Sequence, residues 1–175
     1  MLERFVRLVD ALNEGVGRVF AWFTLGCVLV TFAVVVMRYV LETGFIWMTD
    51  LYVWLHALVF VVGAGYTFKH GGHVRVDILY TGLSARRRAW IDIFGTLVFL
   101  MPWLTVLAVY SAKPILDAWE ILEPSANQGG MPGLFVMKTA LWVFCALVGL
   151  QGLALMARSV LVLRGREEFA PSGSH

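Results

Sequence analysis

Four long stretches of this chain contain no Asp, Glu, Lys or Arg, and they constrain its fold more than any other feature. They cover residues 19–37, 51–68, 93–112 and 139–157. A helix of about 20 residues crosses a hydrocarbon core about 30 Å thick, and each stretch is close to that length. With 59% hydrophobic residues and a mean hydropathy of +0.77, the chain has little sequence left for a soluble domain. The sequence therefore predicts an all-α integral membrane protein with four transmembrane helices.

The positive charges lie mostly on one side of these spans. Eleven of the 14 Lys and Arg residues precede the first span, lie between the second and third, or follow the fourth. The other three, Arg38, Lys113 and Lys138, lie on the opposite side. Because positively charged loops stay in the cytoplasm, we expect both termini to be cytoplasmic (N-in/C-in). The asymmetry also indicates contact with anionic lipids and argues against nucleic acid as a partner.

The chain is expected to form a single membrane domain over residues 1–175, and it has no internal repeat. Its expected segments are an N-terminal amphipathic interfacial helix (1–18), spans at 19–40, 48–68, 91–112 and 134–158, a cytoplasmic loop and helix (69–88), a periplasmic segment (113–133) and a cytoplasmic tail (159–175). Pro102 predicts a kink near the middle of the third span.

The segment before the first span has an amphipathic pattern, with apolar residues at spacings of three and four and charged residues on the other face. This pattern predicts a helix along the cytoplasmic interface, with Arg4 and Arg7 near lipid phosphates. The alternative is a simple cytoplasmic extension of the first span. Ser84 is a candidate N-cap for a helix that runs into the third span, and its Arg86, Arg87 and Arg88 are further candidates for binding lipid headgroups.

The spans contain few groups that could carry chemistry. His56 lies deep in the second span, but no second ionisable group lies at similar depth for a proton relay and no second intramembrane histidine for a b-type haem. We interpret His56 as hydrogen-bonded to a neighbouring helix, and Cys27 and Cys145 as small buried residues. Without a nucleophile–base pair, a phosphate loop or a carboxylate pair, we expect no catalytic, cofactor, metal or substrate residues and no enzyme.

A polar segment follows the second span. His73, Arg75 and Asp77 alternate with apolar residues, so they share one face of an extended segment, and in a helix His73 and Asp77 pair at i, i+4. Asp77 can then balance Arg75 or His73 at the inner membrane surface. A metal site formed with His70 is disfavoured because the segment offers no fourth ligand.

Two further positions have alternative interpretations. Arg38 and Asp50 bracket the first outer loop, and either they form a salt bridge that joins the first two spans or they form an ion pair with a partner subunit. Gln151 lies beside Gly152 in the fourth span. A polar amide next to a small residue suits close helix–helix approach, either with another subunit or within the core of this chain.

The segment after the second span, Gly-Gly-His-Val-Arg-Val-Asp-Ile-Leu-Tyr at 71–80, resembles the signature of the small membrane subunit (DctQ-like) of tripartite ATP-independent periplasmic (TRAP) transporters. Further motifs agree in order: Arg38-Tyr39, then Trp47 and Asp50, then Trp119, Glu123 and Ser125 before Gly-Gly-x-Pro-Gly at 129–133, then Lys138 and Leu-Gln-Gly-Leu at 150–153. The resemblance covers roughly residues 38–159. The chain is most similar to the branch of this family grouped with mannitol, chloroaromatic and 2-oxoacid carriers. It departs from many relatives in having Thr49-Asp50 where they have two adjacent carboxylates.

The resemblance implies a division of labour among three proteins. A large membrane subunit of about twelve spans carries the substrate and sodium sites and moves as an elevator. A periplasmic solute-binding protein delivers the solute, and the small subunit pairs with the stationary scaffold of the large one. No cofactor is expected in this chain, and sodium is expected in the partner. The candidates for structural or partner contacts are Arg38, Trp47, Asp50, His73, Arg75, Asp77, Trp119, Glu120, Glu123, Lys138 and Gln151.

The chain is thus expected to be the small permease subunit of a sodium-coupled, binding-protein-dependent TRAP transporter in a bacterial or archaeal cytoplasmic membrane. It would brace the stationary domain during import of an organic acid or a related small polar solute. The acidic residues Glu120 and Glu123 are candidates for docking the binding protein. One rival is a self-sufficient homo-oligomeric transporter or channel, which requires a charged residue facing a pore at the midplane. The other is a membrane haem or redox protein, which requires paired intramembrane histidines.

Overall fold

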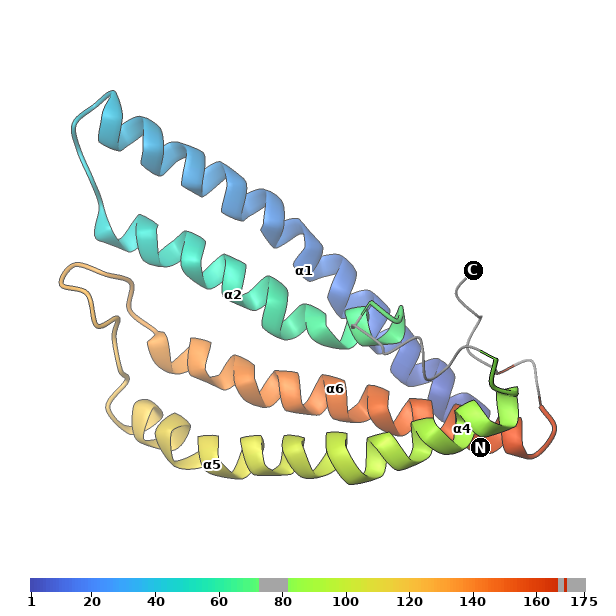
Figure 1. The fold of residues 1–175 in the computed structure, drawn as a ribbon. Helices are drawn as coiled ribbons and strands as arrows, with labels where there is room; N and C mark the ends of the chain where they lie inside the picture. The colour runs from blue at the N-terminus through green and yellow to red at the C-terminus, as the bar shows by residue number, and fades with distance from the viewer. Residues whose placement is uncertain (73–81, 167–168, 170–175) are drawn as a thin grey trace.

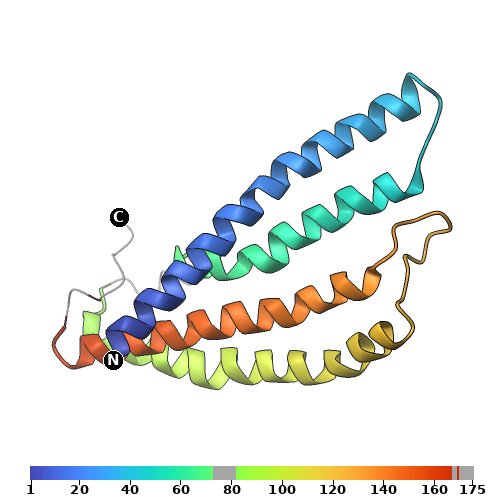
Figure 2. The ribbon, with the colours of Figure 1, turned by 180° about the vertical axis from the view of Figure 1, so that it is seen from behind.

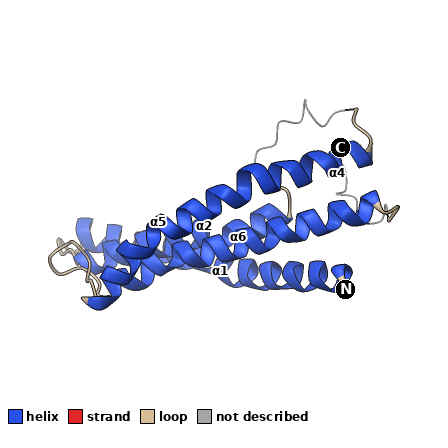
Figure 3. Ribbon diagram, turned by 90° about the horizontal axis from the view of Figure 1, so that it is seen from below, coloured by secondary structure: helices blue, strands red, loops and turns tan. Residues whose placement is uncertain are grey.

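The computed structural model describes residues 1–72, 82–166 and 169, and the regular elements within them are helices (Figure 1). In chain order these are α1 (Leu2–Tyr39), α2 (Ile46–Lys69), α4 (Ala85–Gly95), the π-helical turn η1 (Thr96–Leu100), α5 (Met101–Glu120) and α6 (Leu134–Leu163). Colouring by secondary structure shows no strand in the described part of the chain (Figure 3). Four helical segments, the third running through α4, η1 and α5, are long and apolar enough to cross a membrane. The predicted all-α fold with four spans is confirmed.

Helix α6 is the centre of the packing. The helices lie side by side in the order α1, α2, α6, α5, and the view from behind shows the same order (Figures 1 and 2). α6 contacts each of the other helical elements, and the N-terminal part of α1 crosses to reach it. α6 also contains more buried residues than any other helix. Its buried side therefore fixes the positions of its neighbours.

The core is small and depends on close contact between helices. Ala64 of α2, Leu104 of α5 and Val148 of α6 form a buried cluster, against which Phe68 and Cys145 pack. Lipid tails are as apolar as leucine, so van der Waals contact between small residues must hold such helices together. Gly152 shows this, because a Cβ at that position would lie 2.7 Å from the Leu100 side chain.

α1 is one continuous helix of 38 residues, which differs from the expected separate interfacial helix over residues 1–18. Val6, Val9, Asn13 and Gly17 are its buried residues. They recur at spacings of three and four, so this side of the helix, which shares Val6 and Val9 with the apolar pattern of the sequence, faces other helices of this chain. The alternative of an extension of the first span describes this helix better, because nothing between residues 14 and 20 breaks the backbone hydrogen bonding.

The proline in the third span produces a π turn. Pro102 has no backbone N–H, and its ring would clash with the carbonyl four residues earlier in a regular helix. The chain forms the π turn η1 directly before it, and the Met101 N–H bonds to the Thr96 carbonyl instead. This widened turn lies against Gly152 of α6, where a Cβ would also lie 3.3 Å from the Thr96 side chain. The predicted kink thus takes the form of a local widening where α6 packs closely.

Much of the apolar surface of the spans faces outward. Trp22 and Phe32 on α1, and Phe99 and Trp103 on the third span, are each more than half exposed. None of the residues in the most apolar window of α1 is buried. A membrane or another membrane protein must cover this surface.

Candidate functional site

Asp50 joins the start of α2 to the loop between α5 and α6. Its carboxylate, only 6% exposed, accepts hydrogen bonds from the Asn127 side chain (2.9 Å), the Met131 backbone N–H (2.9 Å) and the Ser125 hydroxyl. Gly130 lies so close to this carboxylate and to Ser125 that a Cβ there would overlap both. The Ser-Ala-Asn-Gln-Gly-Gly-Met sequence at 125–131 therefore forms a cradle for one carboxylate.

A second group of contacts ties the end of α5 to the start of α6. The indole N–H of Trp119 donates to the Thr139 hydroxyl (2.9 Å), and its ring meets Phe135 edge-on with centroids 4.6 Å apart. Glu123 forms an ion pair with Lys138, and both side chains are about one-third exposed. Three residues of the resemblance motifs thus hold the chain's own helices together. Glu120 is exposed and forms no ion pair within the described part of the chain.

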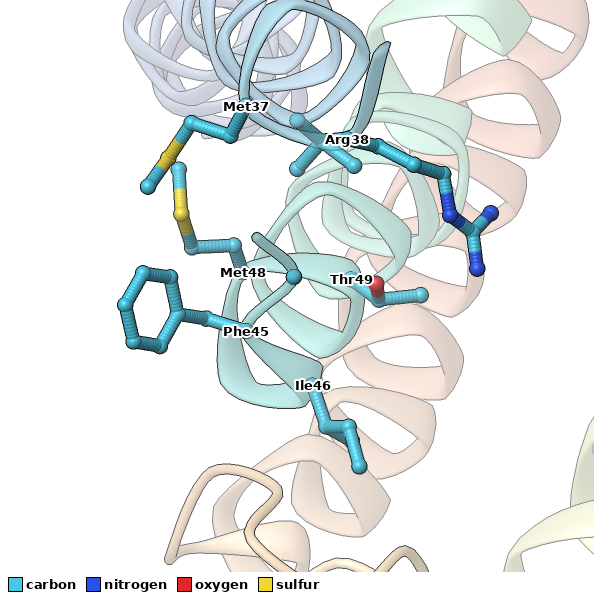
Figure 4. A pocket seen from close by; sticks show the side chains of 8 residues that line it. Met37, Arg38, Phe45, Ile46, Met48 and Thr49 are labelled. Carbon is cyan, nitrogen blue, oxygen red and sulfur yellow. The ribbon is translucent and has the colours of Figure 1, made fainter. Parts of the chain in front are cut away.

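Of the two interpretations of Arg38 and Asp50, the salt bridge that joins the first two spans is not formed. Asp50 is already surrounded by donors from the loop between α5 and α6, which satisfy its carboxylate more closely than a long flexible side chain would. Arg38 is exposed and borders a pocket of about 140 Å³ between the end of α1 and the start of α2. Figure 4 shows Met37, Met48 and Phe45 together on one side of this pocket and the Arg38 guanidinium pointing away from them. Trp47, 44% exposed, lies in the same outer region.

Gln151 is the central residue of a polar cluster between α1 and α6. It is 2% exposed, accepts a hydrogen bond from the Asn13 amide (2.8 Å) and donates one to Asp10 (3.1 Å). Asp10 also forms an ion pair with Arg158. Of the two interpretations of Gln151, contact within this chain is the one the structure has.

Glu14 forms a further ionic group before the uncharged part of α1. Its carboxylate lies 2.7 Å from the Lys69 ammonium, 2.9 Å from the His70 ring and 2.9 Å from the Arg18 guanidinium. The hydrogen bond from Lys69, then those from His70 and Arg18, lower the pKa of Glu14 to about 2. This carboxylate therefore stays ionised at neutral pH and links α1 to the end of α2.

Several other predicted residues have less defined surroundings. His73, Arg75 and Asp77 lie outside the described residues. Within the described ones, no group of three or more His, Cys, Asp or Glu side chains is placed to hold a metal ion. Among the lipid-headgroup candidates, Arg4, Arg7, Arg86 and Arg87 are exposed and Arg88 is half-buried. Arg7 has an acidic neighbour, Glu3, at 4.0 Å.

The two cysteines and the histidine within the spans differ in their surroundings. Cys145 packs against the core, and the Cys27 thiol lies 3.5 Å from the Tyr52 carbonyl, so both are small residues in helix contacts. His56 was expected to hydrogen-bond a neighbouring helix, but this expectation is wrong for the described residues. Its side chain is exposed and makes no hydrogen bond or ion pair with the described residues; its one ring contact there is with Phe60, with centroids 4.7 Å apart.

Sequence reasoning missed Asn13, which is 1% exposed. It falls four residues after Val9 and four before Gly17 in the buried stripe of α1, so an amide within an otherwise apolar stripe was the available signal. Asn127 and Met131 gave no comparable signal, because their partner Asp50 lies about 80 residues earlier in the chain.

Comparison with known proteins decides the family. Residues 27–162 match the family described as tripartite ATP-independent periplasmic transporters, DctQ component. The chain belongs to the DctQ family. It is similar to the C4-dicarboxylate TRAP transporter small permease protein DctQ of Vibrio cholerae serotype O1, with 27% identity over 143 residues. The aligned region covers 73% of this chain and 60% of that relative, so the chain spans less than two-thirds of the relative's length. No solved structure gives a significant match.

DctQ membership and the four long apolar helices make this chain a multi-pass protein of the inner membrane. The match begins at Cys27 and ends at Val162, so it contains most of the four spanning helices but not the N-terminal part of α1. The contacts of Asp50, Trp119 and Lys138 fall within the matched region. Those of Asp10 and Glu14 combine a segment outside it with helices inside it.

Proposed function

We propose that this DctQ chain is the small permease subunit of a sodium-coupled, binding-protein-dependent TRAP transporter that imports an organic acid or a related small polar solute. Its role is mechanical: it braces the stationary domain of the large membrane subunit. The main support for this proposal is the outward-facing surface of the spans. Its exposed aromatic side chains have no partner helix in the described part of the chain. A large membrane protein provides such a partner.

The polar groups support a mechanical role. Asp10, Glu14, Asp50 and Glu123 each pair with residues of the chain itself. They tie helices together at both ends, and the spans between carry no charged residue. A pore or an ion pathway through this chain alone would need charged residues at mid-membrane depth facing a shared cavity. The arrangement therefore favours a brace over the rival homo-oligomeric transporter.

The decisive experiment is uptake into proteoliposomes. Vesicles should contain this chain, the large membrane subunit, or both, with the binding protein and labelled solute outside. We expect uptake only with both membrane proteins, the binding protein and an inward sodium gradient. Uptake by vesicles that contain only this chain would refute the proposal and favour the homo-oligomeric rival. Uptake by the large subunit alone at the full rate would refute the bracing role.

We further propose that the acidic outer end helps to dock the binding protein. Glu120 is the cleaner test position, because reversing Glu123 would also break its ion pair with Lys138. We expect Glu120→Lys to raise the binding-protein concentration needed for half-maximal uptake about two- to fivefold, with Glu120→Gln intermediate. The effect should shrink at high salt. Identical concentration curves for the three proteins would contradict the docking role of this carboxylate.

A further inference from the structure

His56 is a polar side chain at mid-membrane depth without a hydrogen-bond partner among the described residues. It lies near the middle of α2, within the uncharged stretch of residues 51–68. Its side chain is exposed, and in the part of the chain that the structure describes its one ring contact is with Phe60. Several hydroxyl side chains of the spans find acceptors nearby; Thr31, for example, donates to the Cys27 carbonyl (2.7 Å).

An imidazole cannot satisfy its own hydrogen-bonding groups. The neutral ring has one N–H donor and one nitrogen acceptor, and lipid tails offer a partner for neither. Ionisable side chains within spans accordingly face another helix or a water-filled cavity. Because His56 is exposed on α2 and has no hydrogen-bond partner among residues 1–72 and 82–166, its partner lies outside this part of the chain.

The surroundings of His56 suit another membrane helix. Val53, Phe60 and Thr67 are exposed on the same side of α2. Gly63 lies at the edge of this side, where it and Thr67 border a pocket formed with α1, and no atom lies within 4 Å of where its Cβ would be. We call these residues and His56 the α2 stripe. A glycine on an open helix face lets a second backbone approach closely.

A groove runs beside the α2 stripe. Ala57 and Val61, the chain neighbours of His56 and Phe60, line a groove of about 340 Å³ together with Ile115 of α5 and Ala140 of α6. The groove lies between α2 and α5, which both pack on α6. A helix seated against the stripe can place side chains in this groove while a polar group reaches His56.

We propose that the α2 stripe is the surface that contacts the large membrane subunit, and that His56 hydrogen-bonds a polar group of that subunit at mid-membrane depth. This inference rests on the proposed function, because it names the face through which the brace acts. The unpartnered imidazole selects the occupant: lipid tails cannot hydrogen-bond it, whereas a polar side chain or a free carbonyl of a membrane protein can. A second copy of this chain is the competing occupant, and the experiment distinguishes the two.

Photo-crosslinking in the co-expressed complex tests the position of the stripe. Photoreactive benzoylphenylalanine should replace Phe60 in one protein and Phe32 in another, because these side chains are 66% and 67% exposed but lie on α2 and α1. We expect position 60 to give the higher yield of adduct with the large subunit. An adduct between two copies of this chain, or no adduct from position 60 in an intact complex, would overturn the proposal.

Substitution of His56 tests the hydrogen bond. His56→Leu should weaken retention of the large subunit on this chain roughly threefold, and by no more than about fifteenfold, as for other hydrogen bonds between membrane helices. His56→Gln, which can donate and accept, should retain most of the binding. The unfolding transition of the chain alone should not change in His56→Leu, because no intrachain hydrogen bond of the described residues is lost.

The outcomes separate this inference from the proposed function. The role of His56 would be overturned if His56→Leu retained the large subunit as well as the original chain does. It would also be overturned if the substitution destabilised the isolated chain as much as it weakened the binding. In both cases the proposed function stands. If the original chain does not co-purify with the large subunit, the proposed function fails, and this inference fails with it.

Discussion

The cluster around Gln151 allows a quantitative test of how α1 is held on α6. The perturbation is Gln151→Met, which keeps the length of the side chain and removes its polar groups. It deletes the 2.8 Å hydrogen bond from Asn13 and the 3.1 Å hydrogen bond to Asp10. Neither partner is left without any contact, because Asn13 still donates to the Val9 carbonyl (3.3 Å) and Asp10 still pairs with Arg158.

The contacts that Asn13 and Asp10 keep determine how much unfolding free energy Gln151→Met should lose. A buried group that loses its only partner costs about 1–3 kcal/mol, and an average hydrogen bond between membrane helices contributes about 0.6 kcal/mol. With two hydrogen bonds lost and both partners partly satisfied, we expect Gln151→Met to lower the free energy of unfolding by about 1–2 kcal/mol. Asn13→Leu should cost less, because it also removes the buried Asn13 side-chain oxygen, which has no hydrogen-bond partner.

The double variant gives the sharper result. With both amides replaced by apolar groups, no new unsatisfied group is created, so the double variant should cost about 1 kcal/mol less than the sum of the single variants. Reversible unfolding in mixed detergent micelles, followed by far-ultraviolet circular dichroism, measures all three. Independent sites add to within about 0.3 kcal/mol, so additivity at that level would refute the assigned hydrogen bond between α1 and α6. A Gln151→Met variant as stable as the original chain would refute it equally.

Two further predictions concern the outer loop and the inner arginines. Asp50→Ala should speed hydrogen exchange at the Met131 amide at least about tenfold, because a hydrogen bond to a charged acceptor is lost, and unchanged exchange would contradict the cradle. Arg86→Gln with Arg87→Gln should lower retention of phosphatidylglycerol, measured by native mass spectrometry, about fivefold for each arginine, with phosphatidylcholine as the neutral comparison. Arg7→Gln should matter less because Glu3 lies 4.0 Å from the Arg7 guanidinium; an equal effect per arginine would show that total charge alone decides lipid retention.

The sequence predicted those features of the fold that the lipid bilayer imposes on each helix separately. A hydrocarbon layer about 30 Å thick requires long uncharged helices, so the four spans could be found from the spacing of charged residues. A disturbance next to Pro102 could be anticipated in the same way, because a proline disturbs its own helix wherever it packs. Gly152 and Gln151 were recognised as a site of close approach because a small and a polar residue adjoin in an apolar span.

Features that depend on distant parts of the chain could not be predicted. Arg38 and Asp50 have opposite charges and flank one loop, which made an ion pair the natural expectation. The donors that occupy Asp50 come from Asn127 and Met131 in a different loop, and local spacing contains no information about that contact. The outward direction of His56 was hidden for the same reason, since it depends on which sides of α2 are covered by α1 and α6.

The polar contacts between helices are concentrated at the two ends of the four thinly packed helices. At the end near the N-terminus, Glu14 and Asp10 join α1 to α2 and α6. At the opposite end, Asp50 joins α2 to the α5–α6 connection, and Glu123 joins that connection to α6. Between these ends the helices have mainly apolar contacts, which in lipid contribute little beyond van der Waals packing. Fixing both ends limits the tilt of each helix without filling the outward faces, and those faces remain free for a larger partner. A subunit that moved its own helices to transport a solute would need one of these ends to open.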